Sequence, residues 1–117
     1  MEGDAISGHN LEENARPYGD RARVVRTSVE DFLRRERPVA AATFLVDPPR
    51  TGMSPDAVLA MVRAKPSRIV YVSCDAATLA RDARRIVDHG FAIDRADAFD
   101  LFPNTPHVET VAVFLRT

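Results

Sequence analysis

The chain has 117 residues and a formal net charge of −1, from 16 lysines and arginines against 17 aspartates and glutamates. That length fits one domain, and we expect residues 1–117 to form a single, partial domain. The near-neutral charge disfavours a self-sufficient nucleic-acid-binding protein, because such proteins usually carry a strong basic excess. The single cysteine excludes an internal disulfide and a cysteine-rich metal cage. No apolar run approaches the roughly 18 residues of a membrane span, and no leader pattern opens the chain, so we expect a cytoplasmic protein with no membrane partner.

The first part of the chain mixes helical and extended patterns. Residues 4–16 carry a loosely apolar helical stripe and are followed by Pro17, which favours a helix that ends there. Residues 22–26 (ARVVR) predict a short strand. Thr27 and Glu30 stand three apart, as in a capping box, and indicate the start of a second helix.

The next part alternates between strands and helices. Continuous apolar runs at residues 43–46 and 68–72 predict strands that are covered on both faces. Between them, Ser54 followed by a proline resembles an N-cap and first helical position. A second helix is expected from residue 76 to 89, with Leu79, Ala83, Ile86 and Val87 facing inward, and it should stop at Gly90.

Two more strands are predicted at residues 91–96 and 109–115, with no helix between them. Strands separated by helices imply a mostly parallel sheet with helices on both faces, and the last two strands could form a hairpin. Ligands of open α/β sheets bind beyond the carboxyl ends of the strands. The candidate site residues are therefore those that follow Val46, Val72 and Ala96.

The segment after Val46 reads Asp47-Pro48-Pro49-Arg50-Thr51-Gly52. Two consecutive prolines stiffen the backbone and remove two amide donors, so they hold Asp47 at the edge of the sheet. A stiff turn whose aspartate caps a neighbouring group explains the same residues equally well.

The only sulfur nucleophile of the chain, Cys74, lies between the end of a predicted strand and the start of a predicted helix. The amides of a helix N-terminus favour a thiolate at such a place. Most lone cysteines are simply small buried apolar residues, and on position alone this is the more frequent role.

Two polar residues open the last strand. His107 and Glu109 are two apart, so they face the same side of an extended chain. A carboxylate near a thiolate could act as a general base. A solvated start of a strand is the alternative.

In combination these residues are specific. The order Asp47-Pro48-Pro49-Arg50-x-Gly52, Ser73-Cys74-Asp75, Phe102-Pro103-x-Thr105-x-His107-x-Glu109 resembles the RNA 5-methyluridine (uracil-5-) methyltransferase family over nearly the whole chain. These enzymes methylate carbon 5 of uracil in tRNA or rRNA with S-adenosylmethionine. The resemblance implies an α/β, Rossmann-like class I methyltransferase sheet of strand order 3-2-1-4-5-7-6, mostly parallel with an antiparallel C-terminal strand. This chain would lack the first strand and its Gly-rich loop.

The resemblance also implies catalytic roles. Cys74 matches the nucleophile that adds to carbon 6 of uracil. Glu109 matches the base that removes the proton from carbon 5. Asp47 matches an acid near both the methyl donor and the target base.

Supporting roles follow in the same way. Arg50 and His107 match residues on the substrate side, and Glu2 matches an acid that contacts the cofactor ribose. The family usually has Asn-Pro after the cysteine, where this chain has Asp75-Ala76. An acid that faced the sulfur would make the thiolate less favourable.

The implied partners are an RNA substrate and either a missing N-terminal segment or another chain that completes the sheet, because unpaired strand edges are costly. We expect the 117-residue chain alone to be inactive and to bind S-adenosylmethionine weakly or not at all. Arg81, Arg84 and Arg85 are expected to form a solvated helix face rather than an RNA track.

Two other functions stay open. A methyltransferase acting on exocyclic amines often carries Asp/Asn-Pro-Pro followed by an aromatic residue, but Arg50 stands at that position here and the Cys–Glu pair would have no role. A non-catalytic α/β remnant or interaction module would explain the absent cofactor loop.

Overall fold

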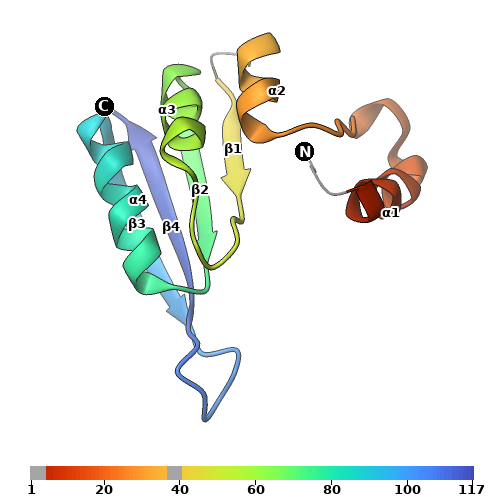
Figure 1. Cartoon of the computed structure of the whole chain (residues 1–117). Coiled ribbons are helices and arrows are strands. Elements are labelled where there is room, and N and C mark those ends of the chain that lie inside the picture. Colours follow the sequence, from red (N-terminus) through yellow and green to blue (C-terminus); the bar gives the residue numbers. More distant parts are fainter. Residues whose placement is uncertain (1–4, 37–40) are drawn as a thin grey trace. The chain divides into compact units, whose positions relative to one another are not determined.

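The computed structural model describes residues 5–36 and 41–117 (Figure 1). The chain divides into two compact units, residues 1–37 and residues 38–117. The single domain expected from the chain length stays a prediction. Within the described part of the chain, no helix is long and apolar enough to cross a membrane.

The first unit is helical. Helix α1 spans Ala5–Ala15, close to the predicted bounds, and the 3₁₀ helix η1 (Arg16–Arg21) continues directly from it. Pro17 lies in the first turn of η1, where its missing N–H costs no hydrogen bond. Helix α2 spans Val29–Arg35.

Two predictions for this unit are wrong. Residues 22–26 form no strand. The described part of the first unit contains no strand with which this segment could pair, and a strand without a partner leaves its backbone groups unpaired. The cap of α2 is Ser28 rather than Thr27, because the Ser28 hydroxyl accepts a hydrogen bond from the Asp31 amide at 3.1 Å.

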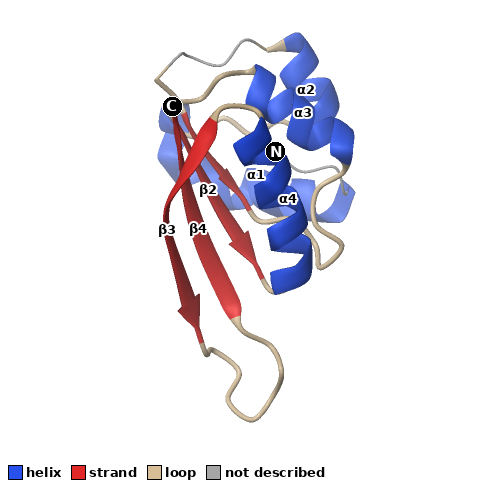
Figure 2. Ribbon diagram, turned by 90° about the vertical axis from the view of Figure 1, so that its left-hand side faces the viewer, coloured by secondary structure: helices blue, strands red, loops and turns tan. Residues whose placement is uncertain are grey.

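The second unit contains a four-stranded sheet (Figure 2). Its strands are β1 (Thr43–Val46), β2 (Arg68–Ser73), β3 (Phe91–Phe99) and β4 (Glu109–Arg116). They are ordered β1-β2-β4-β3, with β1 parallel to β2 and with β4 antiparallel to both β2 and β3. Strands β1, β2 and β3 therefore run in one direction and β4 opposes them. This confirms the predicted sheet, and the order corresponds to the last four strands of 3-2-1-4-5-7-6.

Local sequence chemistry sets the ends of the two helices of this unit. Helix α3 (Pro55–Arg63) begins after Ser54, whose hydroxyl accepts from the Ala57 amide at 3.0 Å. Helix α4 (Ala76–Asp88) is followed by Gly90 with φ of 88°, a left-handed conformation that ends a helix sharply. These ends agree with the prediction.

The hydrophobic core lies between the sheet and these two helices, which cover the same face of the sheet (Figures 1 and 2). The largest apolar core side chains are at most 1% exposed: Val58, Met61, Ile69, Tyr71, Ile86, Phe114. Each such burial contributes roughly 1.5–3 kcal/mol, so this one-sided core is the main source of stability for the unit.

The opposite face carries no helix among residues 41–117, so the prediction of helices on both faces is wrong for this part. Leu45 pairs with Val70, and Val70 pairs with Val113, which places an apolar row on this face. Leu45 is 70% exposed. The prediction of strands buried on both faces fails here because both helices pack on one side.

Helix α4 buries a different stripe from the predicted one. Leu79 and Ile86 point inward as expected, but Val87 is 39% exposed. The third inward position is Asp82, which is fully buried. A buried acid requires hydrogen-bond partners, and these partners connect the core to the candidate site.

Candidate functional site at the carboxyl edge of the sheet

Strands β1 and β2 end at the same edge of the sheet. They are parallel, and Val46 at the end of β1 pairs with Tyr71 in β2. The loop that follows β1 therefore starts beside the last residues of β2. Asp47 is the first residue of that loop and is exposed.

The register of β2 against β4 brings the nucleophile and base candidates to the same place. Ser73 pairs with Thr110, so the next positions along the two antiparallel strands are Cys74 and Glu109. Both residues are half-buried. The cysteine is free and is not sealed inside the core. The register thus places a thiol and a carboxylate at neighbouring positions of this edge.

A second pair joins the loop after β1 to the loop between β3 and β4. Arg50 Nη2 lies 3.1 Å from His107 Nδ1. A guanidinium can only donate, so Nδ1 is the acceptor and the imidazole proton is on Nε2. The His107 amide donates to the Thr105 hydroxyl at 3.3 Å, and that hydroxyl donates to the Phe102 carbonyl at 2.7 Å. The histidine is therefore held by its own loop as well as by Arg50.

Asp75, the neighbour of the cysteine, is the N-cap of α4. Its Oδ1 accepts from the Thr78 amide at 2.8 Å. Hydrogen bonding by Thr78, first through its amide, holds the pKa of the Asp75 carboxyl below its ordinary value, and the charge of Arg50 adds a smaller effect. The carboxylate therefore serves the helix end, a role that asparagine fills equally well.

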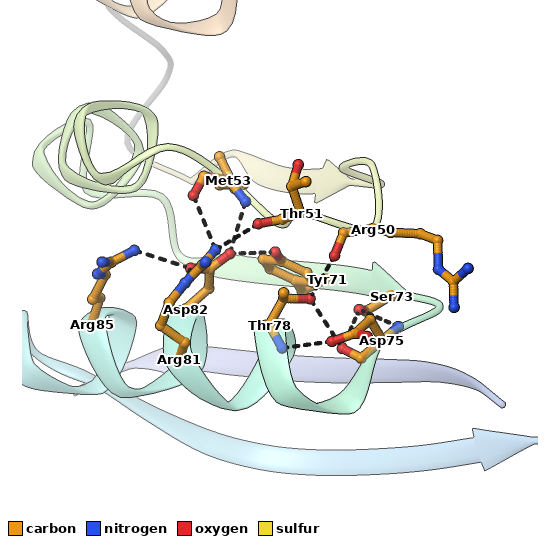
Figure 3. A network of polar contacts seen from close by, with 10 residues as sticks. All are labelled: Arg50, Thr51, Met53, Tyr71, Ser73, Asp75, Thr78, Arg81, Asp82 and Arg85. Carbon is orange, nitrogen blue, oxygen red and sulfur yellow. Dashed lines mark hydrogen bonds and ion pairs between the residues drawn. The ribbon is translucent and has the colours of Figure 1, made fainter. Parts of the chain in front are cut away.

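A buried network lies behind this edge (Figure 3). Asp82 Oδ2 accepts from the Tyr71 hydroxyl at 2.7 Å and from the Met53 amide at 2.8 Å. Its Oδ1 accepts from Arg81 Nε at 2.9 Å and from Arg85 Nη1 at 3.2 Å. Arg81 and Arg85, expected on a solvated helix face, therefore also pair with a buried carboxylate, while their side chains stay 43% and 36% exposed.

These contacts change the acidity of two groups. Burial raises the pKa of Asp82, but the hydrogen bonds from Arg81, Tyr71 and Met53 outweigh burial and leave it below its ordinary value. Burial, followed by the bond to Asp82, raises the pKa of Tyr71. Asp82 is therefore an anion and Tyr71 a neutral donor across the physiological range.

The sequence profile of the tRNA (uracil-5-)-methyltransferase family matches residues 23–117. The chain belongs to this family. A Thermotoga maritima protein named an uncharacterized RNA methyltransferase is 42% identical over 92 residues, which cover 79% of this chain and 21% of that protein. A Gloeobacter violaceus protein with a similar name is 40% identical over 118 aligned positions, which cover 100% of this chain and 25% of that protein.

A solved structure agrees with the family assignment. The crystal structure of the Pyrococcus abyssi tRNA (uracil-54, C5)-methyltransferase in complex with S-adenosyl-L-homocysteine is 35% identical to this chain, with a TM-score of 0.75. The match covers 97% of this chain and 27% of the Pyrococcus protein. The chain thus spans about a fifth to a quarter of the length of these relatives.

Within this uracil-5-methyltransferase fold, most of the predicted site residues lie on loops or strand ends at the carboxyl edge: Asp47, Arg50, Cys74, His107, Glu109. Cys74 and Glu109 occupy the next positions beyond the Ser73–Thr110 pair, and a hydrogen bond joins Arg50 to His107. Glu2 lies outside the described residues. In the part that the structure describes, no cluster of His, Cys, Asp and Glu could hold a metal ion.

Sequence reasoning missed Asp82. The signal was available, because Asp82 lies three residues after Leu79 and four before Ile86, in the middle of the inward stripe of α4. An acid at such a position predicts a buried, paired carboxylate. The partners themselves could not be identified from spacing, because Met53 and Tyr71 come from other elements.

We expect the cap of α4 to tolerate asparagine but not alanine. Asp75→Ala should lower the free energy of unfolding by about 1 kcal/mol, because the Thr78 amide loses its acceptor. Asp75→Asn should stay within about 0.5 kcal/mol of the original chain, because asparagine is an equally good N-cap. Urea unfolding followed by far-ultraviolet circular dichroism measures both changes. Equal losses in the two variants would contradict the capping role.

Proposed function

We propose that this chain is the C-terminal part of the S-adenosylmethionine-dependent catalytic domain of an RNA (uracil-5-)-methyltransferase, and that Cys74 forms a covalent bond to the target uridine of a tRNA or rRNA. One observation carries the proposal. The register Ser73 to Thr110 leaves Cys74 and Glu109 as the next positions on adjacent strands, at the edge where Asp47 and Arg50 also emerge. Membership of the family supports the same reaction.

The first step uses Cys74. Carbon 5 of uracil is a poor nucleophile, and the base must leave its stack before a side chain can reach it. The Cys74 thiolate adds to carbon 6, and the electron pair of the C5–C6 double bond moves towards carbon 5 and the carbonyl oxygen as an enolate. The ring is thereby activated at the carbon that receives the methyl group.

The cofactor site is only partly supplied by the described residues. S-adenosylmethionine, when bound, supplies an electrophilic methyl group to carbon 5. Asp47, exposed directly after β1, fits a position beside the donor and the base, and Glu2 is the residue proposed for the ribose. The chain has no Gly-rich loop for the rest of the cofactor. Further residues, from the same protein or from another chain, are therefore needed to complete the site.

The last step uses Glu109. After methyl transfer, carbon 5 carries both a methyl group and a proton. The Glu109 carboxylate takes that proton, the C5–C6 double bond re-forms, and the bond from carbon 6 to the Cys74 sulfur breaks. Arg50 and His107 serve on the substrate side, where a guanidinium and a neutral imidazole offer hydrogen-bond donors to the uridine or its phosphate.

An RNA that contains 5-fluorouridine tests the covalent step. Fluorine at carbon 5 leaves no proton for Glu109 to remove, so the complete protein with S-adenosylmethionine should remain bonded to the RNA. The adduct is measured by denaturing gel electrophoresis, and mass spectrometry of the peptides should locate it at Cys74. RNA methylation on ordinary RNA without any adduct would instead support a methyltransferase acting on exocyclic amines. No methyl transfer by the complete protein would support a non-catalytic module.

A further inference from the structure

We propose that Thr78, Arg81 and Asp82 of α4 are positioning residues, which together hold the loop of residues 49–53 against the helix and thereby set where Arg50 meets His107. The inference deepens the proposed function and rests on it for the reaction concerned. The predicted placement of Arg50 against His107 can be tested without an activity assay.

Three side chains on one face of α4 hold the loop by its backbone. Thr78, Arg81 and Asp82 are spaced three and four residues apart, so they lie on the same side of the helix. Their partners are successive backbone groups of the loop: Thr78 Oγ1 to the Arg50 carbonyl at 3.1 Å, Arg81 Nη2 to the Thr51 carbonyl at 2.9 Å, and the Met53 amide to Asp82 Oδ2 at 2.8 Å. The loop is thus bonded to α4 along its length (Figure 3).

Gly52 gives independent evidence that the loop is pressed onto this pair. A Cβ at this position would lie 2.5 Å from Arg81 Nη2 and 2.6 Å from Asp82 Oδ2, closer than real contacts allow. Gly52 also has a backbone φ angle of 74°, which residues with a side chain rarely adopt. Its amide donates to the Pro49 carbonyl at 2.8 Å. Only glycine allows the turn to approach the carboxylate so closely.

The carboxylate is needed because it accepts on both oxygens. Asp82 is fully buried, and the Arg81 Nε that it binds belongs to the same guanidinium whose Nη2 donates to the Thr51 carbonyl. An asparagine amide has one oxygen and one NH₂ group, so its N–H groups would face the donors that now bind one of the two carboxylate oxygens. Arg81 would then be released from the loop.

The network reaches the candidate site through the backbone of Arg50, and Thr78 also bonds to Asp75, the neighbour of Cys74. Among the residues that the structure describes, none of the hydrogen bonds of the network involves the side chains of Cys74, Glu109 or Asp47. In Figure 3 the Arg50 side chain points away from the network, and its guanidinium is the group that contacts His107. A shift of the loop should therefore change the contact with His107 first.

Nuclear magnetic resonance of the imidazole nitrogens in the full chain tests the geometry. The chain has three histidines, so the ring signals of His107 can be assigned with a His107→Gln variant. Asp82→Asn and Thr78→Val should each move the His107 Nδ1 signal away from its hydrogen-bonded position. Thr78→Val removes the hydroxyl that donates to the Arg50 carbonyl and to the Asp75 carbonyl, and it leaves the buried carboxylate in place, so it decides the test if Asp82→Asn does not fold.

Asp88→Asn is the matched control. Asp88 is an exposed carboxylate on the same helix, paired with Arg84 at 3.0 Å, and it has no contact with the loop in the described structure. It should leave the His107 signals unchanged. Unchanged signals in both folded test variants, or equal changes in the control, would overturn the proposal.

Adduct formation on 5-fluorouridine RNA by the complete protein supplies the second measurement. We expect Thr78→Val to slow the adduct rate by roughly 10- to 100-fold with little change in RNA affinity, because a misplaced group affects the reacting geometry more than binding. A loss confined to affinity would contradict positioning. If the unaltered protein forms no adduct while the His107 signals still respond, the proposed function fails and the positioning of Arg50 by α4 stands.

Discussion

Replacement of Glu109 with glutamine is expected to turn the complete protein into a covalent trap for its RNA. Glutamine keeps the size of the side chain but cannot accept the proton of carbon 5. Addition of Cys74 and methyl transfer can still occur, whereas the final elimination should slow by roughly 10²- to 10⁴-fold, the usual contribution of a general base. The measurement is the amount of protein–RNA adduct on ordinary, unfluorinated RNA, together with the rate of product release.

Cys74→Ala supplies the opposite outcome in the same assay. Without the thiolate, carbon 5 is not activated, so product formation should fall by at least about 10⁴-fold and no adduct should form on any RNA. The double variant should behave as Cys74→Ala alone, because elimination matters only after addition. An adduct that persists without Cys74, or a Glu109→Gln protein that turns over normally, would contradict the assigned pair.

Asp82→Asn is expected to give the largest loss of stability among single polar substitutions in the second unit. The buried carboxylate accepts four hydrogen bonds, from Met53, Tyr71, Arg81 and Arg85. Asparagine cannot accept all of them, and the loss should be about 2–3 kcal/mol at neutral pH. This loss is smaller than the roughly 3–5 kcal/mol typical of broken buried pairs, because the arginine side chains are 43% and 36% exposed and water can solvate them once released.

The pH dependence of this loss has a definite sign. The folded-state pKa of Asp82 is lowered from its ordinary value of 3.8, so the carboxylate binds its proton less readily in the folded protein than in the unfolded chain. The contribution of Asp82 to the free energy of unfolding is therefore complete when the pH is above its ordinary pKa of 3.8. That contribution is lost as the pH falls below 3.8 and through the pKa of Asp82 in the folded state. The difference in unfolding free energy between the original chain and Asp82→Asn should shrink over that acidic range.

Urea unfolding at several pH values measures both effects. Asp88→Asn again serves as control, since an exposed ion pair contributes at most about 1 kcal/mol. Tyr71→Phe should give an intermediate loss of about 1–2 kcal/mol, because it removes one of the four donors and leaves the charge paired. A pH-independent difference for Asp82→Asn would show that the carboxylate is not the group responsible.

The helices of the second unit were predictable because their signals are local. Ser54 and Pro55 start α3 through bonds within four residues, and Gly90 ends α4 through its own backbone conformation. The failed strand at residues 22–26 shows the limit of such signals. A helix forms the hydrogen bonds of its backbone groups internally. A strand instead needs a partner strand, and that partner can lie far away in the sequence or be absent.

The candidate site likewise combines residue types that the sequence predicts with spatial neighbours that only the tertiary structure sets. The motif order named the residue types at the strand ends, including Cys74 and Glu109, but not their neighbours in space. Strand register alone places those two at the next positions beyond the Ser73–Thr110 pair, although 35 positions separate them in the chain. Register is a property of hydrogen bonds between strands, and no residue carries it by itself.

The amino-acid sequence alone determined the α/β alternation, the helix ends and the identities of the reactive groups. Each of these depends on neighbouring residues or on side-chain chemistry. The folded chain decides which face of the sheet is covered, which residue buries its charge and how the loop of Arg50 is held. These depend on pairings between distant segments, such as Asp82 with Met53 and Tyr71, whose free energy exists only once the helix lies against the strand and the loop.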